Sequence, residues 1–184
     1  MNIQTTLSVE EEQGVPFTPT TETEYTICLC RSRKTLTLAK VLFHKHGIHA
    51  WVPRKVNNRP KPGEKRVKAA LPGFLFVPVE EFKEADRLQK RLLVPTFKAL
   101  VVNGLIKQCT HKELVDFETA IKASAQTQLP VTRELHVGDN VVVSMGPFTG
   151  IKATIEEIYY SGCLMVTIKS GNAPVIRMPA AFLS

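Results

Sequence analysis

Apolar residues follow two different patterns along this chain, and the change comes near residue 134. Before that point, short runs of β-branched and aromatic residues alternate with stretches of helical period. We expect extended segments over residues 25–30, 48–54, 67–79 and 97–102. We expect helices over residues 35–46 and 80–93, and a third beginning after Thr110. This mixed order predicts an α+β unit, with helices packed on an antiparallel sheet.

Local signals predict where two of these helices begin and end. Gly47 is well placed to end the first helix, because glycine tolerates the left-handed conformation common after helix ends. Thr110 and Glu113 have the spacing of a capping box at the start of the third helix. The apolar face of the first helix is expected to consist of Leu36, Ala39, Leu42 and Phe43.

From residue 134 onward the pattern predicts short strands separated by Gly, Pro and Asn. They are expected over residues 141–144, 153–158, 163–168 and 174–178. About fifty residues of this kind predict a small β-barrel. The predicted organisation is therefore a disordered acidic tail (1–23), an α+β domain (24–123), a linker (124–133) and a barrel (134–184).

Charge is distributed unevenly over these parts. The chain has a net charge of +7, yet residues 1–24 hold five acidic residues and no Lys or Arg. Residues 25–123 hold twenty basic and eight acidic residues, whereas residues 134–184 hold three basic and four acidic ones. The two modules are therefore expected to have different partners, and attraction to a polyanion would come from the first.

Several classes of protein are disfavoured by the sequence. No apolar run is long enough to span a bilayer, and the N-terminus lacks the pattern of a secretory signal. The four cysteines form no CxxC pair, which favours reduced thiols and a cytoplasmic protein. His44, His46 and His49 lack partners at metal-ligand spacing, and no nucleotide-binding loop or nucleophile motif is present. We therefore expect no metal, no cofactor and no enzymatic activity.

One segment near the C-terminus combines turns and strands in a recognisable order. Gly138-Asp139 predicts a turn into a strand, Gly146-Pro147 a second turn and Gly150 a third, with Phe148 buried between the strands. This segment resembles the KOW motif of NusG-family factors and several ribosomal proteins. The family usually has glycine where this chain has Ala153, a position that would be strained if its φ were positive.

Residues 25–123 resemble the N-terminal domain of the NusG family. An aromatic residue opens the first strand, the helix and Gly47 lead to a strand ending in Val52-Pro53, and a basic hairpin follows. The run Leu71–Val77 is then very similar to the family's Phe-Pro-Gly-Tyr-Val-Leu-Val. The short connection at Gly47 and the absence of an opening Trp-Tyr resemble the specialised RfaH-type paralogues more than housekeeping NusG.

The resemblance implies a transcription elongation factor that acts as a monomer. In the family, an apolar patch of the N-terminal domain binds the clamp helices of the largest RNA polymerase subunit, and the KOW domain binds Rho or a small-subunit ribosomal protein. By position, the patch here would comprise Tyr25, Leu29, Leu71, Phe74 and Phe76. Phe74 and Phe76 share one face of a strand and Leu75 and Val77 the other, so one pair must belong to the core.

Basic residues provide a second candidate site. Arg31, Arg33 and Lys34 precede the first helix, where RfaH-type proteins contact the displaced non-template DNA strand. Further cations of the predicted hairpin could neutralise phosphates, among them Arg54, Lys55, Arg59, Lys65 and Arg66. The alternative for both groups is a solvated charged surface. The alternative for the whole chain is a ribosome-associated RNA-binding KOW protein, which the net charge of −1 over residues 134–184 disfavours.

Overall fold

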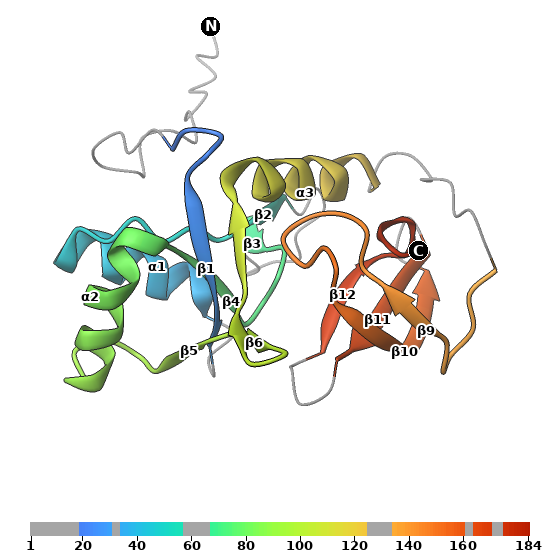
Figure 1. Cartoon of the computed structure of the whole chain (residues 1–184). Helices are drawn as coiled ribbons and strands as arrows, with labels where there is room; N and C mark the ends of the chain where they lie inside the picture. The colour runs from blue at the N-terminus through green and yellow to red at the C-terminus, as the bar shows by residue number, and fades with distance from the viewer. Residues whose placement is uncertain (1–18, 31–33, 57–66, 125–133, 161–163, 171–174) are drawn as a thin grey trace, which may run out of the picture.

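Strand β1 (Glu24–Cys30) is the centre of the N-terminal sheet in the computed structural model of this chain (Figure 1). The structure describes residues 19–30, 34–56, 67–124, 134–160, 164–170 and 175–184. β4 (Phe74–Pro78) pairs with one edge of β1, and β5 (Phe97–Ala99) and β8 (Gln108–Thr110) share the other, all antiparallel. The predicted α+β class is confirmed.

Helices α1 (Thr35–His46) and α2 (Val79–Lys90) cover one face of this sheet (Figure 1). α1 ends as predicted at Gly47, which has a φ of 68° and donates its N–H to the Phe43 carbonyl, while the next N–H, of Ile48, donates to the Leu42 carbonyl. The expected apolar face of α1 was partly wrong, because Leu38 and Leu42 are its buried aliphatic residues while Phe43 is only half-buried. These two residues, four positions apart, point at the sheet.

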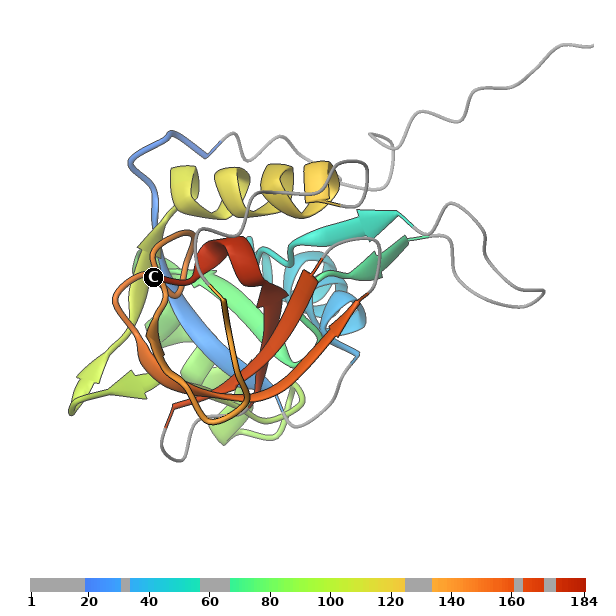
Figure 2. The same cartoon turned by 90° about the vertical axis from the view of Figure 1, so that its right-hand side faces the viewer.

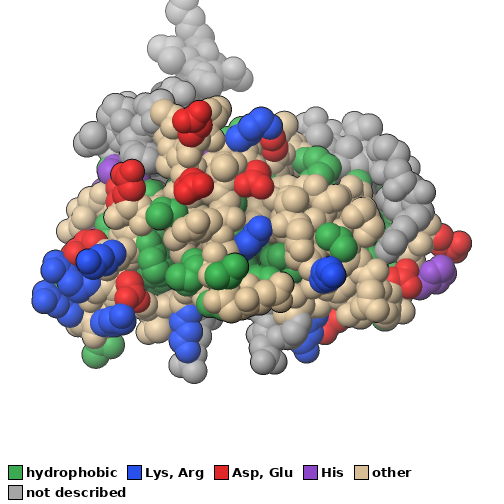
Figure 3. Space-filling model, viewed as in Figure 1, with side chains coloured by type: hydrophobic (Ala, Val, Ile, Leu, Met, Phe, Trp, Pro, Cys, Tyr) green, Lys and Arg blue, Asp and Glu red, His purple; other side chains and the backbone are tan. Residues whose placement is uncertain are grey.

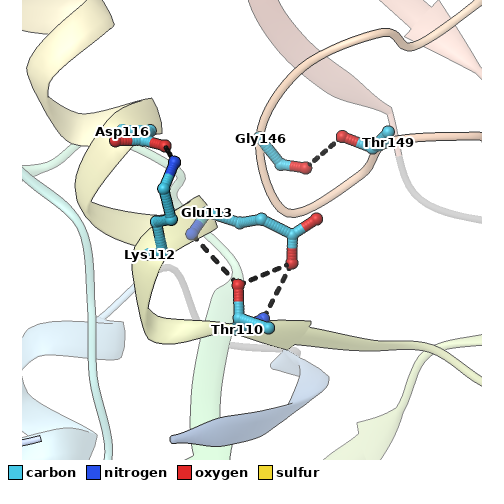
Figure 4. Close-up of polar contacts among 6 residues, drawn as sticks. All are labelled: Thr110, Lys112, Glu113, Asp116, Gly146 and Thr149. Atoms are coloured by element: carbon cyan, nitrogen blue, oxygen red, sulfur yellow. Dashed lines mark hydrogen bonds and ion pairs between the residues drawn. The ribbon is translucent and has the colours of Figure 1, made fainter. Parts of the chain in front are cut away.

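Helix α3 (His111–Ser124) follows β8 without a loop, and its predicted capping box is confirmed (Figure 4). The backbone N–H of Thr110 donates to Glu113 Oε2 at 2.8 Å, and the N–H of Glu113 donates to Thr110 Oγ1 at 3.3 Å. This reciprocal pair satisfies two backbone donors at the helix start and fixes the direction in which α3 leaves the sheet.

Two of the expected strands are interrupted in the structure. The segment expected over 48–54 is joined to β4 only by a bridge between Trp51 and Phe76, and β2 (Arg54–Val56) begins where that segment was expected to end. β2 pairs with β3 (Val67–Ala69) in a separate ribbon. The segment expected over 97–102 divides into β5 and β6 (Val101–Val102), and β6 forms a hairpin with β7 (Leu105–Ile106).

The C-terminal unit, by which we mean the described residues of 134–184, contains one antiparallel sheet in the order β12-β11-β10-β9. Its strands are β9 (Asn140–Val142), β10 (Lys152–Tyr160), β11 (Leu164–Lys169) and β12 (Ile176–Pro179), followed by the short helix η2 (Ala180–Phe182). The last residues return to the first strand, because Val142 and Ser184 exchange backbone hydrogen bonds of 3.0 and 2.9 Å. The sheet therefore curls, and its two edges meet through the chain end.

The turns of the C-terminal unit depend on glycine at the predicted positions. Gly138, Gly146 and Gly150 all have positive φ values, of 94°, 78° and 83°. Ala153 lies within β10 opposite Val141, and the structure assigns it no positive φ. Alanine at this position therefore carries none of the strain that a left-handed conformation would impose.

Buried apolar residues form two clusters, divided by the N-terminal sheet. One cluster lies between the sheet and helices α1 and α2. The second combines residues of the opposite sheet face, α3 and the C-terminal unit, so these parts share one apolar interior. Figure 2 shows the C-terminal unit lying against the N-terminal sheet beside α3. Within the described residues, no helix has the length and apolar character needed to cross a membrane. Of the predicted tail, residues 1–18 lie outside the described residues, and Thr23 accepts a hydrogen bond from the His111 N–H.

Candidate functional site

The strand β4 divides its side chains between the two faces of the N-terminal sheet. Leu75 and Val77 are fully buried and pack in the cluster beneath α1 and α2. Phe74 and Phe76 point the other way, into the cluster shared with α3 and the C-terminal unit. Of the two alternating pairs, Leu75 and Val77 thus form the core of the N-terminal unit proper.

The other three residues of the expected patch lie on the same side as Phe74 and Phe76. Tyr25, Ile27 and Leu29 are two positions apart along β1 and therefore share a face, and Ile27 lies opposite Phe76. Leu71 is 2% exposed in the turn before β4. We use the name apolar face for these side chains, namely Tyr25, Ile27, Leu29, Leu71, Phe74 and Phe76. The sequence resemblance had not named Ile27, although period-two alternation along β1 would have included it.

The C-terminal unit covers the apolar face. Phe148, which is fully buried, packs edge-on against Phe74 with the ring centroids 5.1 Å apart. Edge-to-face contact at this separation is the favoured geometry for two phenyl rings. Phe148 was expected between two strands of its own barrel, and the structure shows that it also reaches across to the N-terminal sheet.

Helix α3 closes the remaining side of this contact. Phe117 of α3 lies 5.4 Å from Phe182 and 6.5 Å from Phe148, measured between ring centroids. Gly146 approaches the same ring so closely that a Cβ added there would lie 2.7 Å from Phe117 Cδ2. Glycine at 146 is therefore required twice, for its positive φ and for this close approach.

Polar contacts at the edge of the covered face are few among the described residues. Lys107 Nζ donates to the backbone carbonyl of Thr149 at 2.9 Å, which ties the segment before β8 to the C-terminal unit. Thr149 Oγ1 in turn donates to the Gly146 carbonyl and stabilises the turn that carries Phe148 (Figure 4). Figure 4 shows this turn beside the capped start of α3.

Three aromatic side chains with polar atoms meet near the start of α3. Trp51 packs edge-on against His111 at 5.2 Å, and Tyr25 lies 6.0 Å from the same imidazole. Their polar atoms Tyr25 Oη, Trp51 Nε1 and His111 Nδ1 are buried and have no hydrogen-bond partner among the described residues. Burial raises the pKa of Tyr25 to about 12 and lowers the pKa of His111, because both charged forms lose hydration.

Replacing Tyr25 by phenylalanine is expected to change the alkaline stability of the protein. An unfolded chain releases the tyrosine proton near pH 10, whereas the folded chain holds it until about pH 12. Between these values the folded state binds more protons, so its stability falls as pH rises, by about 1.4 kcal/mol per pH unit from this residue. Urea unfolding of both proteins at pH 7 and pH 11 should show a smaller alkaline loss for Tyr25→Phe. An equal loss in the two proteins would contradict this assignment.

The expected nucleic-acid residues are only partly within the described chain. Arg31, Arg33, Arg59, Lys65 and Arg66 lie outside it. Lys34 precedes α1, which has no acidic residue in its first turn. Arg54 and Lys55 lie on β2, where Lys55 is directly opposite Lys68 of β3. Like charges directly opposite in a ribbon repel one another, so this pair is favourable for binding an anion.

Histidine and cysteine side chains serve structural contacts in the described residues. His49 Nδ1 lies 2.7 Å from Glu81 Oε1, and its backbone N–H donates to Glu81 Oε2, which joins the segment after α1 to α2. No three His, Cys, Asp or Glu side chains gather as a metal site would require in the part of the chain described. Burial raises the pKa of Cys30 to about 12 and that of Cys28 further, so these thiols stay protonated and poorly nucleophilic.

Comparison with known proteins gives similarity at the level of solved structures alone. No protein-family model matches the chain, and no curated protein matches its sequence. A structure of Thermotoga maritima NusG, concerned with its domain interaction, has 16% identity and a TM-score of 0.38 over 88% of this chain and 96% of that one. The MjSpt4:Spt5 complex in conformation A has 16% identity and a TM-score of 0.26 over 88% and 95% of the two chains. The functional argument therefore rests on the residues of this chain.

Proposed function

We propose that this protein is a transcription elongation factor that binds RNA polymerase through its apolar face. The observation that carries the proposal is the position of Phe74 and Phe76, on the sheet face that α1 and α2 leave free. Desolvation of such a face drives association with an apolar partner. The sequence resemblance to NusG-family factors supplies the partner, the clamp helices of the largest polymerase subunit.

Polymerase can occupy this face only when the C-terminal unit no longer covers it. Phe148 occupies the space against Phe74 that a partner would need, and Tyr25, Leu71, Phe74 and Phe76 are all at most 3% exposed. The structure therefore corresponds to a closed form in which the proposed site is unavailable. The measured affinity for polymerase would be reduced by the fraction of molecules that are closed.

Cations near the proposed site favour contact with nucleic acid. The opposed pair Lys55 and Lys68 adds positive potential to the β2–β3 ribbon. Together with Lys34 at the start of α1, they suit contact with the phosphates of the displaced non-template DNA strand. We propose no sequence-specific reading, and no catalytic role for any residue of the chain.

The C-terminal unit is proposed to be a KOW barrel that recruits a second partner. Its curled sheet and the pairing of Val142 with Ser184 support a barrel. The net charge of −1 over residues 134–184 favours a protein such as Rho or a small-subunit ribosomal protein over RNA. We propose that the factor is cytoplasmic and, because the short connection at Gly47 resembles that of RfaH-type proteins, that it belongs with those paralogues.

Retention of purified RNA polymerase by the immobilised full-length protein tests this function. We expect wild-type protein to retain polymerase weakly and Leu71→Ala/Phe74→Ala to retain at least about tenfold less, because two central apolar contacts are lost. Leu75→Val is the matched control, since Leu75 lies on the opposite face of the same strand. The proposal fails if neither wild type nor Phe148→Leu, which weakens the closed form, retains polymerase, or if the double variant and the control retain as much as wild type.

A further inference from the structure

The hairpin of β6 and β7 projects from the body of the protein at the border of the apolar face. Asn103 and Gly104 join the two strands with φ values of 52° and 78°. Two central residues of positive φ form a tight turn that matches the twist of the strands and makes the hairpin a defined structure. Figure 2 shows it extending outward beside the C-terminal unit.

This hairpin exposes large aliphatic side chains on both of its faces. Val101, Leu105 and Ile106 are 55%, 75% and 49% exposed. Val101 lies opposite Ile106, and Val102 lies opposite Leu105, so the two pairs point to opposite sides. A two-stranded ribbon gains little stability from such side chains in water, which suggests a role in contact with a partner.

The hairpin is continuous with the apolar face that the C-terminal unit covers. Val102 packs against the shared cluster, and Leu100, at the base of the hairpin, is 1% exposed within it. Lys107, just after β7, donates its backbone N–H to the Leu100 carbonyl and its side chain to Thr149 of the C-terminal unit. Leu105 shares a hairpin face with Val102, so it extends the same surface beyond the cover. Figure 3 shows apolar side chains reaching the surface between the two units.

We propose that the β6–β7 hairpin is a first docking point for the polymerase element that the apolar face binds. The inference rests on the proposed function, and it adds a route by which polymerase can bind the closed form. Polymerase would contact both sides of the hairpin, Leu105 on the side that continues the apolar face and Ile106 on the other, while the C-terminal unit still covers Phe74. It would then replace the C-terminal unit from the hairpin inward, without waiting for the unit to leave spontaneously.

The two routes differ in how the association rate depends on polymerase concentration. If the C-terminal unit must leave first, the observed rate reaches a ceiling set by spontaneous opening. If polymerase docks on the closed form, the observed rate rises past that ceiling, because displacement of the unit by bound polymerase is faster than spontaneous opening. Stopped-flow mixing of labelled full-length protein with excess polymerase measures this dependence directly.

The test compares wild type with Leu105→Gln/Ile106→Gln, and uses Leu93→Gln as a control. Leu93 is 56% exposed in the turn that follows α2, outside the hairpin and the apolar face. We expect the double variant to associate about tenfold more slowly and to level off at the rate of spontaneous opening, while wild type and the control exceed that rate. Because all three side chains are exposed, their replacement should leave the thermal unfolding midpoint unchanged.

A second background separates failure of this inference from failure of the proposed function. Phe148→Leu weakens the contact with Phe74 and should open the chain. In that background the hairpin variant should lose only about twofold in association rate, because the face is already accessible. An equal loss in both backgrounds would make the hairpin an ordinary part of the final interface, and no loss in either would exclude it as a docking point. If neither wild type nor Phe148→Leu binds polymerase, the proposed function itself is wrong.

Discussion

Phe148→Ala is expected to lower the free energy of unfolding by about 3 to 5 kcal/mol, the usual cost of removing a buried phenyl ring. Unlike most destabilising substitutions, it should also increase polymerase retention. Phe148 is fully buried against Phe74 and near Phe117, so its loss removes the central contact of the closed form. Chemical unfolding and polymerase retention of the same variant measure the two effects.

A double-mutant cycle decides whether Phe148 and Phe74 touch in solution. Phe74→Ala and Phe148→Ala should show a coupling energy of about 1 kcal/mol, as expected for an edge-on aromatic pair. Phe97 supplies the control, because it is equally buried but belongs to the cluster beneath α1 and α2. Coupling between Phe97 and Phe148 as large as that between Phe74 and Phe148 would contradict the arrangement. Milder substitution by leucine keeps the cycle measurable if the alanine variants unfold.

Gly146→Ala is the second substitution with a large expected effect. The left-handed backbone alone costs an alanine about 1 to 2 kcal/mol. The added Cβ would also lie 2.7 Å from Phe117 Cδ2, a separation at which α3 and the turn must move apart. We expect a total loss of about 3 kcal/mol or more in unfolding free energy, since overpacking adds a further one to three.

Two comparisons separate these causes for Gly146. Gly150 has a similar φ of 83°, but nothing lies within 4 Å of a Cβ added there, so Gly150→Ala should show the backbone cost alone. Phe117→Val should relieve the clash and reduce the additional cost of Gly146→Ala. If Gly146→Ala and Gly150→Ala were equally costly, Gly146 and Phe117 would not be in contact in solution.

The parts of the fold that local chemistry controls could be predicted from the sequence. The left-handed Gly47 ends α1, and the reciprocal hydrogen bonds of Thr110 and Glu113 begin α3, as predicted. Such signals depend on residues a few positions apart, so they can be recognised before any tertiary contact is known. Alternation along Phe74–Val77 likewise predicted which side chains share a face.

What could not be predicted depends on partners distant in the sequence. β8 contains only Gln108, Cys109 and Thr110, and it is a strand because it pairs with the first half of β1. The segment after Gly47 was expected as a strand on composition, yet it forms a single bridge at Trp51. Segments this short contain too few residues to show a hydrophobic period, so pairing with distant strands determines their structure.

The packing of the C-terminal unit on the apolar face also could not be predicted from the sequence. The two units differ in charge, which predicted separate partners, but charge does not reveal that their apolar side chains meet. Phe117 had one detectable signal, its spacing of three from Leu114 on α3, which indicates a buried helix face. Nothing in that spacing shows that Phe182 of the C-terminal unit is the neighbour.

The apolar cluster shared by the two units affects thermal stability and polymerase binding in opposite directions. If the apolar face serves polymerase, then Tyr25, Phe74 and Phe76 stabilise the closed chain with the same atoms that a partner needs. Selection for a higher melting temperature through this cluster would therefore favour proteins that respond poorly, a trade-off between stability and activity. Substitutions beneath α1 and α2, around Leu75 and Val77, escape that conflict. Substitutions around these two residues are therefore the ones expected to raise the melting temperature without reducing polymerase binding.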